Sequence, residues 1–176
     1  SMKGGKASNS VIDELKMVIV KDDSFIDTLK DLKLKYQYQN IGEEAHITIF
    51  GKSAHGSMPE LGVNAGIAAL SALGTHYGIG FLSNLAESYQ DTRGHHLDAY
   101  YKSDLLGEST YNIGLIDYHD GVLQFVTNFR HPEQVNIEDH LAHVAGLTDM
   151  EVTALSSSKP LLFDPESDFI QKLLSV

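Results

Sequence analysis

Two tight turns, each lying between a pair of strand-like runs, constrain the fold of this chain more than any other feature. Residues 36–41 and 45–50 flank Gly42-Glu43-Glu44, and residues 110–117 and 122–129 flank His119-Asp120-Gly121. A short glycine-containing turn between alternating apolar and polar runs is typical of a β-hairpin. Both pairs are therefore expected to form antiparallel strands.

Helical patterns alternate with these hairpins. Asp22-Asp23-Ser24 offers a cap for a helix that runs to about residue 35, and residues 61–77 are rich in alanine and glycine, which favours close packing against a sheet. Asn136 is the expected cap of a third helix. The apolar side of that helix is expected to carry Ile137, Leu141, Val144 and Leu147.

The order strand, helix, strand occurs twice along the chain. Residues 11–20 and 36–41 enclose the first helix, and residues 121–130 and 151–155 enclose the third. Short helices or loops are expected over residues 78–108, and another helix from residue 165. The class predicted is α+β, with mostly antiparallel sheet, helices on one face, and two related ferredoxin-like halves over residues 1–50 and 51–160.

Composition excludes several functions. Twenty-four acidic against 13 basic residues give a net charge of -11, so binding to nucleic acid or to an anionic membrane surface is not expected. The 176 residues include no cysteine, which excludes disulfides and thiolate metal sites and is typical of the cytoplasm. The opening Ser1-Met2 is typical of tag removal, and we expect an excised domain.

The segment GKSAHGSMPELGVNA, residues 51–65, places a histidine between a strand and a helix. Gly51 permits a close backbone approach, and the turn ending at Pro59 precedes the helix. This arrangement puts the imidazole of His55 on a rim of the domain, where it can meet a ligand. The alternative is a structural histidine that bonds a nearby carbonyl.

This segment resembles the G-x-x-x-H-x-x-x-P-x-x-G-x-N-A signature of the lid, or dimerisation, domain of M20 family zinc metallopeptidases. The matching residues are Gly51, His55, Pro59, Gly62, Asn64 and Ala65. GGKASNSVIDEL is similar to the stretch that enters this lid, with Ile12 where proline is usual, and VTNFRHPE is similar to the family's N-x-R-x-P turn. The resemblance spans nearly the whole chain and fits best the dipeptidases of the PepV type.

The resemblance implies a lid without metal ligands of its own. A separate domain of the same chain would hold two zinc ions and a general-base glutamate, and residues 161–176 would return to that domain. His55 would donate a hydrogen bond to the oxyanion, Arg130 would bind the carboxylate of the dipeptide, and Asn9 would hydrogen-bond the substrate. The fragment alone is expected to be inactive.

Other interpretations stay open. Arg130 could form a surface salt bridge, and Asn9 could be a turn residue with no contact to substrate. The chain could also be a stand-alone ligand-sensing or dimerisation module. A third alternative is a small complete hydrolase with a metal held by His95, His96 and Asp98. These residues look like the family's H-x-D motif, and Glu43-Glu44 looks like its acid pair. In the M20 family the H-x-D motif precedes the acid pair and both precede the lid, whereas here the glutamates come first and both motifs lie inside the lid.

Overall fold

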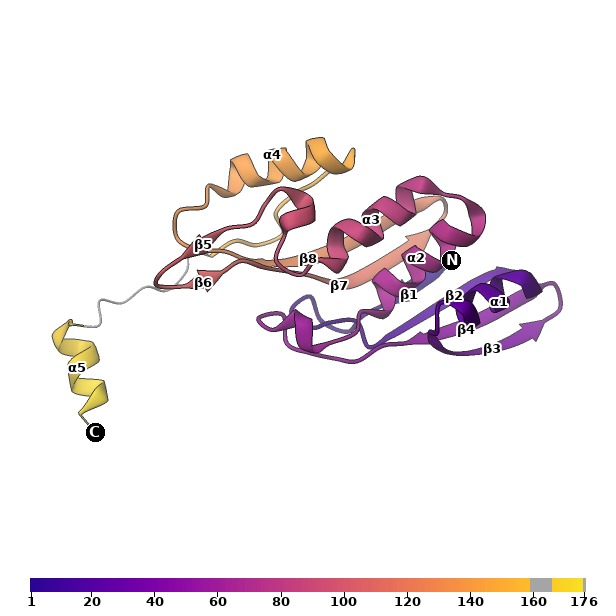
Figure 1. The fold of residues 1–176 in the computed structure, drawn as a ribbon, viewed down its shortest axis with the longest axis horizontal. Helices are drawn as coiled ribbons and strands as arrows, with labels where there is room; N and C mark the ends of the chain where they lie inside the picture. Colours follow the sequence, from indigo (N-terminus) through magenta and orange to yellow (C-terminus); the bar gives the residue numbers. More distant parts are fainter. Residues whose placement is uncertain (159–165, 176) are drawn as a thin grey trace.

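A six-stranded antiparallel sheet forms the centre of the molecule (Figure 1). The computed structural model describes residues 1–158 and 166–175. The strand order is β3-β4-β2-β1-β7-β8. The strands are β1 (Met2–Gly4), β2 (Glu14–Val20), β3 (Lys35–Ile41), β4 (Glu44–Phe50), β7 (Thr110–His119) and β8 (Val122–Arg130), and a separate small hairpin joins β5 (Lys102–Ser103) to β6 (Gly107–Glu108).

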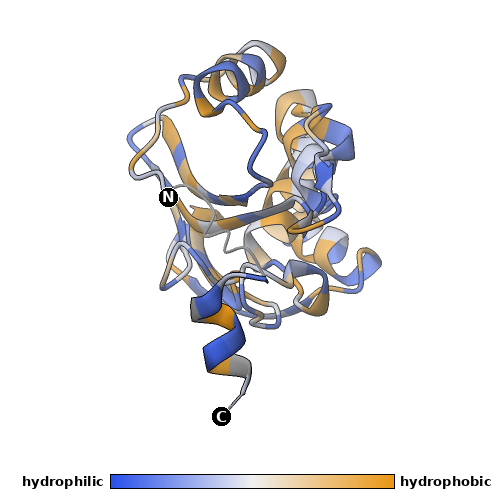
Figure 2. Ribbon diagram, turned by 90° about the vertical axis from the view of Figure 1, so that its left-hand side faces the viewer, coloured by the Kyte–Doolittle hydropathy of each residue, from blue (hydrophilic) through white to orange (hydrophobic). Residues whose placement is uncertain are grey.

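Helices cover one face of this sheet. They are α1 (Asp23–Asp31), α2 (Ala65–Tyr77), α3 (Gly80–Gln90) and α4 (Ile137–Thr148), with the short 3-10 helices η1 (Pro59–Leu61) and η2 (His95–Leu97). Near the end of the chain lies α5 (Asp168–Leu174). Figure 2 shows apolar residues, in orange, where the helices meet the strands. The predicted α+β class, antiparallel sheet and one-sided helix layer are confirmed.

Strand register places the core on the helix side. Leu15 of β2 lies opposite Ile49 of β4, Met17 lies opposite Ile47, and all four side chains are buried. Because side chains alternate along a strand, the intervening positions face the other way. That second face is polar: Lys3 of β1, for example, forms an ion pair with an aspartate of β7.

Three of the long helices begin at a side-chain cap. The carboxylate of Asp22 accepts hydrogen bonds from two amides of α1, and the amide oxygen of Asn136 does the same for α4, so both predicted caps are confirmed. Asn64 caps α2, which therefore starts at Ala65 and not at residue 61. Leu61 instead ends η1 (Pro59–Leu61), because Pro59 opens a short turn of its own.

Two predictions about the second half are wrong. Residues 151–155 form no strand. Their alternation of apolar residues buries little, since Leu155 stays 78% exposed. On α4 the buried side is rotated from the one predicted. Val144 is buried as expected, but Leu147 is 51% exposed. His140, which is only 5% exposed, packs against the sheet instead. The ring of His140 stacks on Phe129 of β8 with centroids 4.1 Å apart.

The connectivity contains one ferredoxin-like unit. β2, α1, β3, β4, α2 and β7 follow a βαββαβ order, and β1, which the sequence did not predict, lies between β2 and β7. The proposed boundary after residue 50 falls between β4 and η1, inside this single sheet, and stays a prediction.

The predicted last helix corresponds to α5. Residues 159–165, which include the start of the proposed return segment, lie outside the described residues. No helix in the described ranges is both long and apolar enough to span a membrane.

Candidate functional site

The turn that carries His55 is fastened to two other parts of the chain. The Gly56 N–H donates to the carbonyl of Asn9 over 2.7 Å, and the Val11 N–H donates to the carbonyl of Ala54 over 2.9 Å. From the other side, the buried Thr110 hydroxyl donates to the carbonyl of Gly56 over 3.0 Å. The backbone on either side of His55 is therefore held by the segment before β2 and by the start of β7.

The other residues of the signature build this turn. A Cβ at Gly51 would lie 2.0 Å from the Val63 carbonyl oxygen, so only glycine fits where the strand end and the return of the turn touch. The Asn64 amide caps α2 and also donates to the Ile113 carbonyl over 2.8 Å, which ties the helix to β7. Pro59 and Ala65 are buried. The imidazole of His55, in contrast, is exposed.

The surroundings of His55 determine which ring nitrogen carries a proton. The Ser57 N–H donates to Nδ1 of His55 over 3.3 Å, and the Ser57 hydroxyl lies 2.7 Å from the same nitrogen. Because a backbone N–H can only donate, Nδ1 acts as the acceptor, and the proton of the neutral ring resides on Nε2. Within the described residues Nε2 has no hydrogen-bond partner, so His55 presents an N–H donor to solvent.

Arg130 lies at the end of β8, and its side chain is exposed. Its Nε donates to Oδ1 of Asn128 over 3.3 Å. Across residues 1–158 and 166–175, no carboxylate forms an ion pair with Arg130, so the surface salt bridge considered as an alternative is not found there. The same Oδ1 lies 2.6 Å from where a Cβ of Gly56 would stand.

Asn9 is exposed, and its described contact in this region is the carbonyl that accepts from Gly56. The structure therefore places all three predicted site residues around Gly56. His55 is its chain neighbour, Asn9 bonds its N–H, and Arg130 reaches it through Asn128. Ile12, which departs from the family pattern, is buried in the core cluster.

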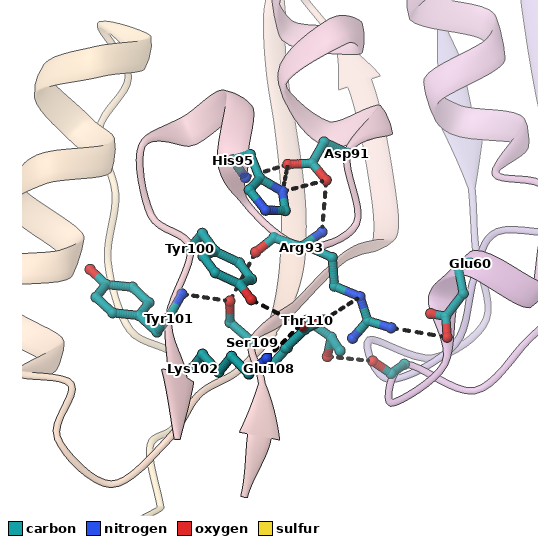
Figure 3. Close-up of polar contacts among 11 residues, drawn as sticks. Glu60, Asp91, Arg93, His95, Tyr100, Tyr101, Lys102, Glu108, Ser109 and Thr110 are labelled. Carbon is teal, nitrogen blue, oxygen red and sulfur yellow. Dashed lines mark hydrogen bonds and ion pairs between the residues drawn. The ribbon is translucent and has the colours of Figure 1, made fainter. Parts of the chain in front are cut away.

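An ordered polar network supports the turn from outside, and the sequence did not predict it (Figure 3). The Arg93 guanidinium lies 3.1 Å from the Glu60 carboxylate of η1 and 3.8 Å from that of Glu108. Tyr100 donates to Glu108 over 2.9 Å, and this bond lowers the pKa of the Glu108 carboxyl, as do the nearby charges of Lys102 and Arg93. The network joins the segment of residues 91–109 to the element that follows His55.

The residues of the complete-hydrolase alternative are used elsewhere. The backbone and ring of His95 bond to Asp91, and the ring stacks on Tyr100 with centroids 4.3 Å apart. His96 Nδ1 lies 3.0 Å from the carbonyl oxygen of Glu87. Glu43 lies in the turn between β3 and β4, Glu44 is the first residue of β4, and both are exposed. In the part of the chain that the structure describes, no three histidine, aspartate or glutamate side chains converge as a metal site would require.

Comparison with known proteins relates the chain distantly to peptidases. No protein-family model matches it. It is similar to proteins of Staphylococcus aureus named "putative dipeptidase", from strains USA300 and MRSA252, with 25% identity over 195 aligned residues. The alignment covers 99% of this chain, and the chain spans 41% of the length of these relatives.

Proposed function

We propose that this chain is the lid domain of an M20 family dipeptidase of the PepV type, which closes over a dizinc active site formed by the rest of the parent chain. The main support for the proposal is that the signature residues within 51–65 have two different roles. Gly51, Asn64 and the buried members of the signature fix a rigid turn, and His55 is the member left exposed with an N–H donor. The similarity to proteins named as dipeptidases supports the same proposal.

Zinc in such an enzyme would be held by residues outside this chain. The described residues offer no converging ligand set, so they do not fit a metal site of their own. When bound to the parent enzyme, the metal would supply Lewis-acid activation of the scissile carbonyl. The contribution of this chain lies in hydrogen bonds from the opposite side of the substrate.

His55 would stabilise negative charge on the carbonyl oxygen as the peptide bond is attacked. An N–H donor aimed at a developing oxyanion strengthens in the transition state more than in the ground state. Ser57 holds Nδ1 as an acceptor, which keeps the donor on Nε2. The hydrogen bonds from the Gly56 N–H to the Asn9 carbonyl and from the Thr110 hydroxyl to the Gly56 carbonyl limit how far the ring can move.

Arg130 would bind the terminal carboxylate of the dipeptide. A planar guanidinium matches a carboxylate with two parallel hydrogen bonds, and Arg130 is exposed, with an amide and no acid beside it in the described structure. The side chain of Asn9 would contribute a further hydrogen bond to the substrate from the neighbouring segment.

The decisive experiment replaces His55 by alanine in the full-length parent enzyme. We expect kcat to fall on the order of a hundred- to a thousandfold, with a smaller change in KM, as for loss of one oxyanion donor. Zinc content and circular dichroism should stay unchanged, because the ring is exposed. His46→Ala is the matched control, since His46 is a partly exposed histidine whose ring pairs with Glu44. A near-normal kcat in His55→Ala would mean that the histidine is structural.

A further inference from the structure

We infer that Asn128 is a positioning residue, which orients the guanidinium of Arg130 and couples it mechanically to the His55 turn. This inference rests on the proposed function for its kinetic consequences, but its structural part can be tested without activity. Asn128 lies on β8, is half-buried, and stands between Arg130 and Gly56.

The contact with Arg130 selects one edge of the guanidinium. Its Nε–H donates to Asn128 Oδ1 over 3.3 Å, which leaves the two terminal Nη groups available. These groups form a fork that can bind both oxygens of a carboxylate. Asn128 thus keeps one face of Arg130 engaged with the protein and the other directed outward.

The chemical nature of the partner matters as much as its position. The chain carries 24 acidic residues against 13 basic ones, yet the group that holds Arg130 is a neutral amide. A carboxylate at this position would also orient the guanidinium, but it would neutralise the charge and compete with an anionic ligand. An amide orients the guanidinium without either effect.

The contact with Gly56 connects this pair to the histidine turn. A Cβ at Gly56 would lie 2.6 Å from Asn128 Oδ1, so the turn backbone and the amide are packed as closely as glycine allows. Asn112, the cross-strand neighbour of Asn128, donates to the Ser10 carbonyl over 2.8 Å and fixes the other side of the turn. Displacement of Gly56 would therefore move Asn128, and with it Arg130.

The structural part is tested by NMR on the 176-residue chain. The Nε–H of Arg130 should exchange slowly with water in the wild type, and Asn128→Ala should increase its exchange severalfold and shift its resonance. Gly56→Ala should shift the same resonance, and much less so when Asn128 is already alanine, because the two sites are coupled. Gln124→Ala, at an exposed position on the same strand, is the control and should leave it unchanged.

The kinetic part uses Asn128→Asp in the full-length parent enzyme. The new carboxylate would pair with Arg130 and neutralise it. It would also repel the terminal carboxylate of the dipeptide, so KM for a dipeptide should rise about tenfold or more. KM for the corresponding dipeptide amide, which lacks the terminal carboxylate, should change little. Gln124→Glu adds the same charge to the same strand at a distance from Arg130 and should have no such effect.

The outcomes separate this inference from the proposed function. An unchanged Arg130 Nε–H signal in Asn128→Ala overturns the positioning role, whatever the kinetics. If that signal changes and Arg130→Lys raises KM, but Asn128→Asp does not, the coupling to substrate binding is overturned. If Arg130→Lys also leaves KM unchanged, the carboxylate-binding part of the proposed function fails, while the NMR result still decides the role of Asn128.

Discussion

At the scale of single residues, the candidate site is a set of donors held by neutral partners. Nε2 of His55 and the guanidinium of Arg130 both face outward, and both are oriented by uncharged groups, Ser57 and Asn128. Neutral partners fix geometry and leave the donors able to act on a negatively charged ligand. On a surface that only stabilises the fold, a guanidinium such as that of Arg130 would more often pair with an acidic side chain.

A second residue-scale feature concerns His140, which is buried between Tyr111 and Phe129. Burial lowers its pKa to about 4, and the charges of His143 and His131 act in the same direction. A histidine whose pKa is lower in the folded than in the unfolded state stabilises the fold fully above pH 6.5. That contribution is lost as the pH falls toward 4.

We therefore predict that acid destabilises the wild type more than His140→Phe. Between pH 7.5 and pH 5, His140 should cost the wild type about 2 kcal/mol of unfolding free energy, and the phenylalanine variant should lack this loss. Urea unfolding at the two pH values measures the difference. Equal losses in both proteins would show that His140 is not forced to stay neutral in the fold.

At the scale of elements, Arg93 links η1 to residues 91–109, and this link predicts a local effect. Arg93→Met should raise hydrogen exchange across residues 56–62, because the ion pair with Glu60 no longer holds the turn. Global stability should change by only about 0–1 kcal/mol, since the pair is partly exposed. Hydrogen exchange followed by mass spectrometry measures both.

Lys30→Met is the control for this experiment, since it removes an ion pair with Asp27 on α1 that lies at 2.8 Å. It should leave residues 56–62 as protected as in the wild type. If Arg93→Met also leaves their protection unchanged, the polar network of Figure 3 does not stabilise the histidine turn.

Elements set by local chemistry could be predicted from the sequence. Both hairpins and the caps at Asp22 and Asn136 depend on residues within a few positions of one another. The strand at residues 151–155 could not be judged this way, because a strand needs a neighbouring edge and a surface to bury. β1 was missed because it has three residues, and because Met2, taken as part of a tag remnant, is in fact buried in the core.

The same distinction holds for the candidate site. His55, Arg130 and Asn9 could be named because they belong to motifs that are read along the chain. Asn128 lies in one of those motifs, but its contact with Gly56 joins positions that are distant in sequence. Arg93 belongs to no motif, and its partner Glu60 is identified only by the folded structure.

At the scale of the whole molecule, we predict that the isolated chain neither hydrolyses dipeptides nor retains zinc. The described residues offer hydrogen-bond donors but no converging metal ligands, and peptide hydrolysis by this chemistry needs both. Metal analysis after dialysis and a dipeptide hydrolysis assay test this, with the full-length parent as the positive control. Stoichiometric zinc in the isolated chain would contradict this prediction and support a metal site at His95 and His96.

The position of β1 also constrains how the domain folds. Met2 pairs with Met17 on one side and with Tyr118 on the other, so the second residue of the chain lies at the middle of the sheet. Until β7 is in place, β1 can pair only with β2. Strands β3, β4 and β2 then remain unjoined to strands β7 and β8. Contacts between residues so distant in sequence slow folding, because a long loop must close before they form. The sheet is therefore expected to assemble slowly, with the closure of β1 against β7 as a late step.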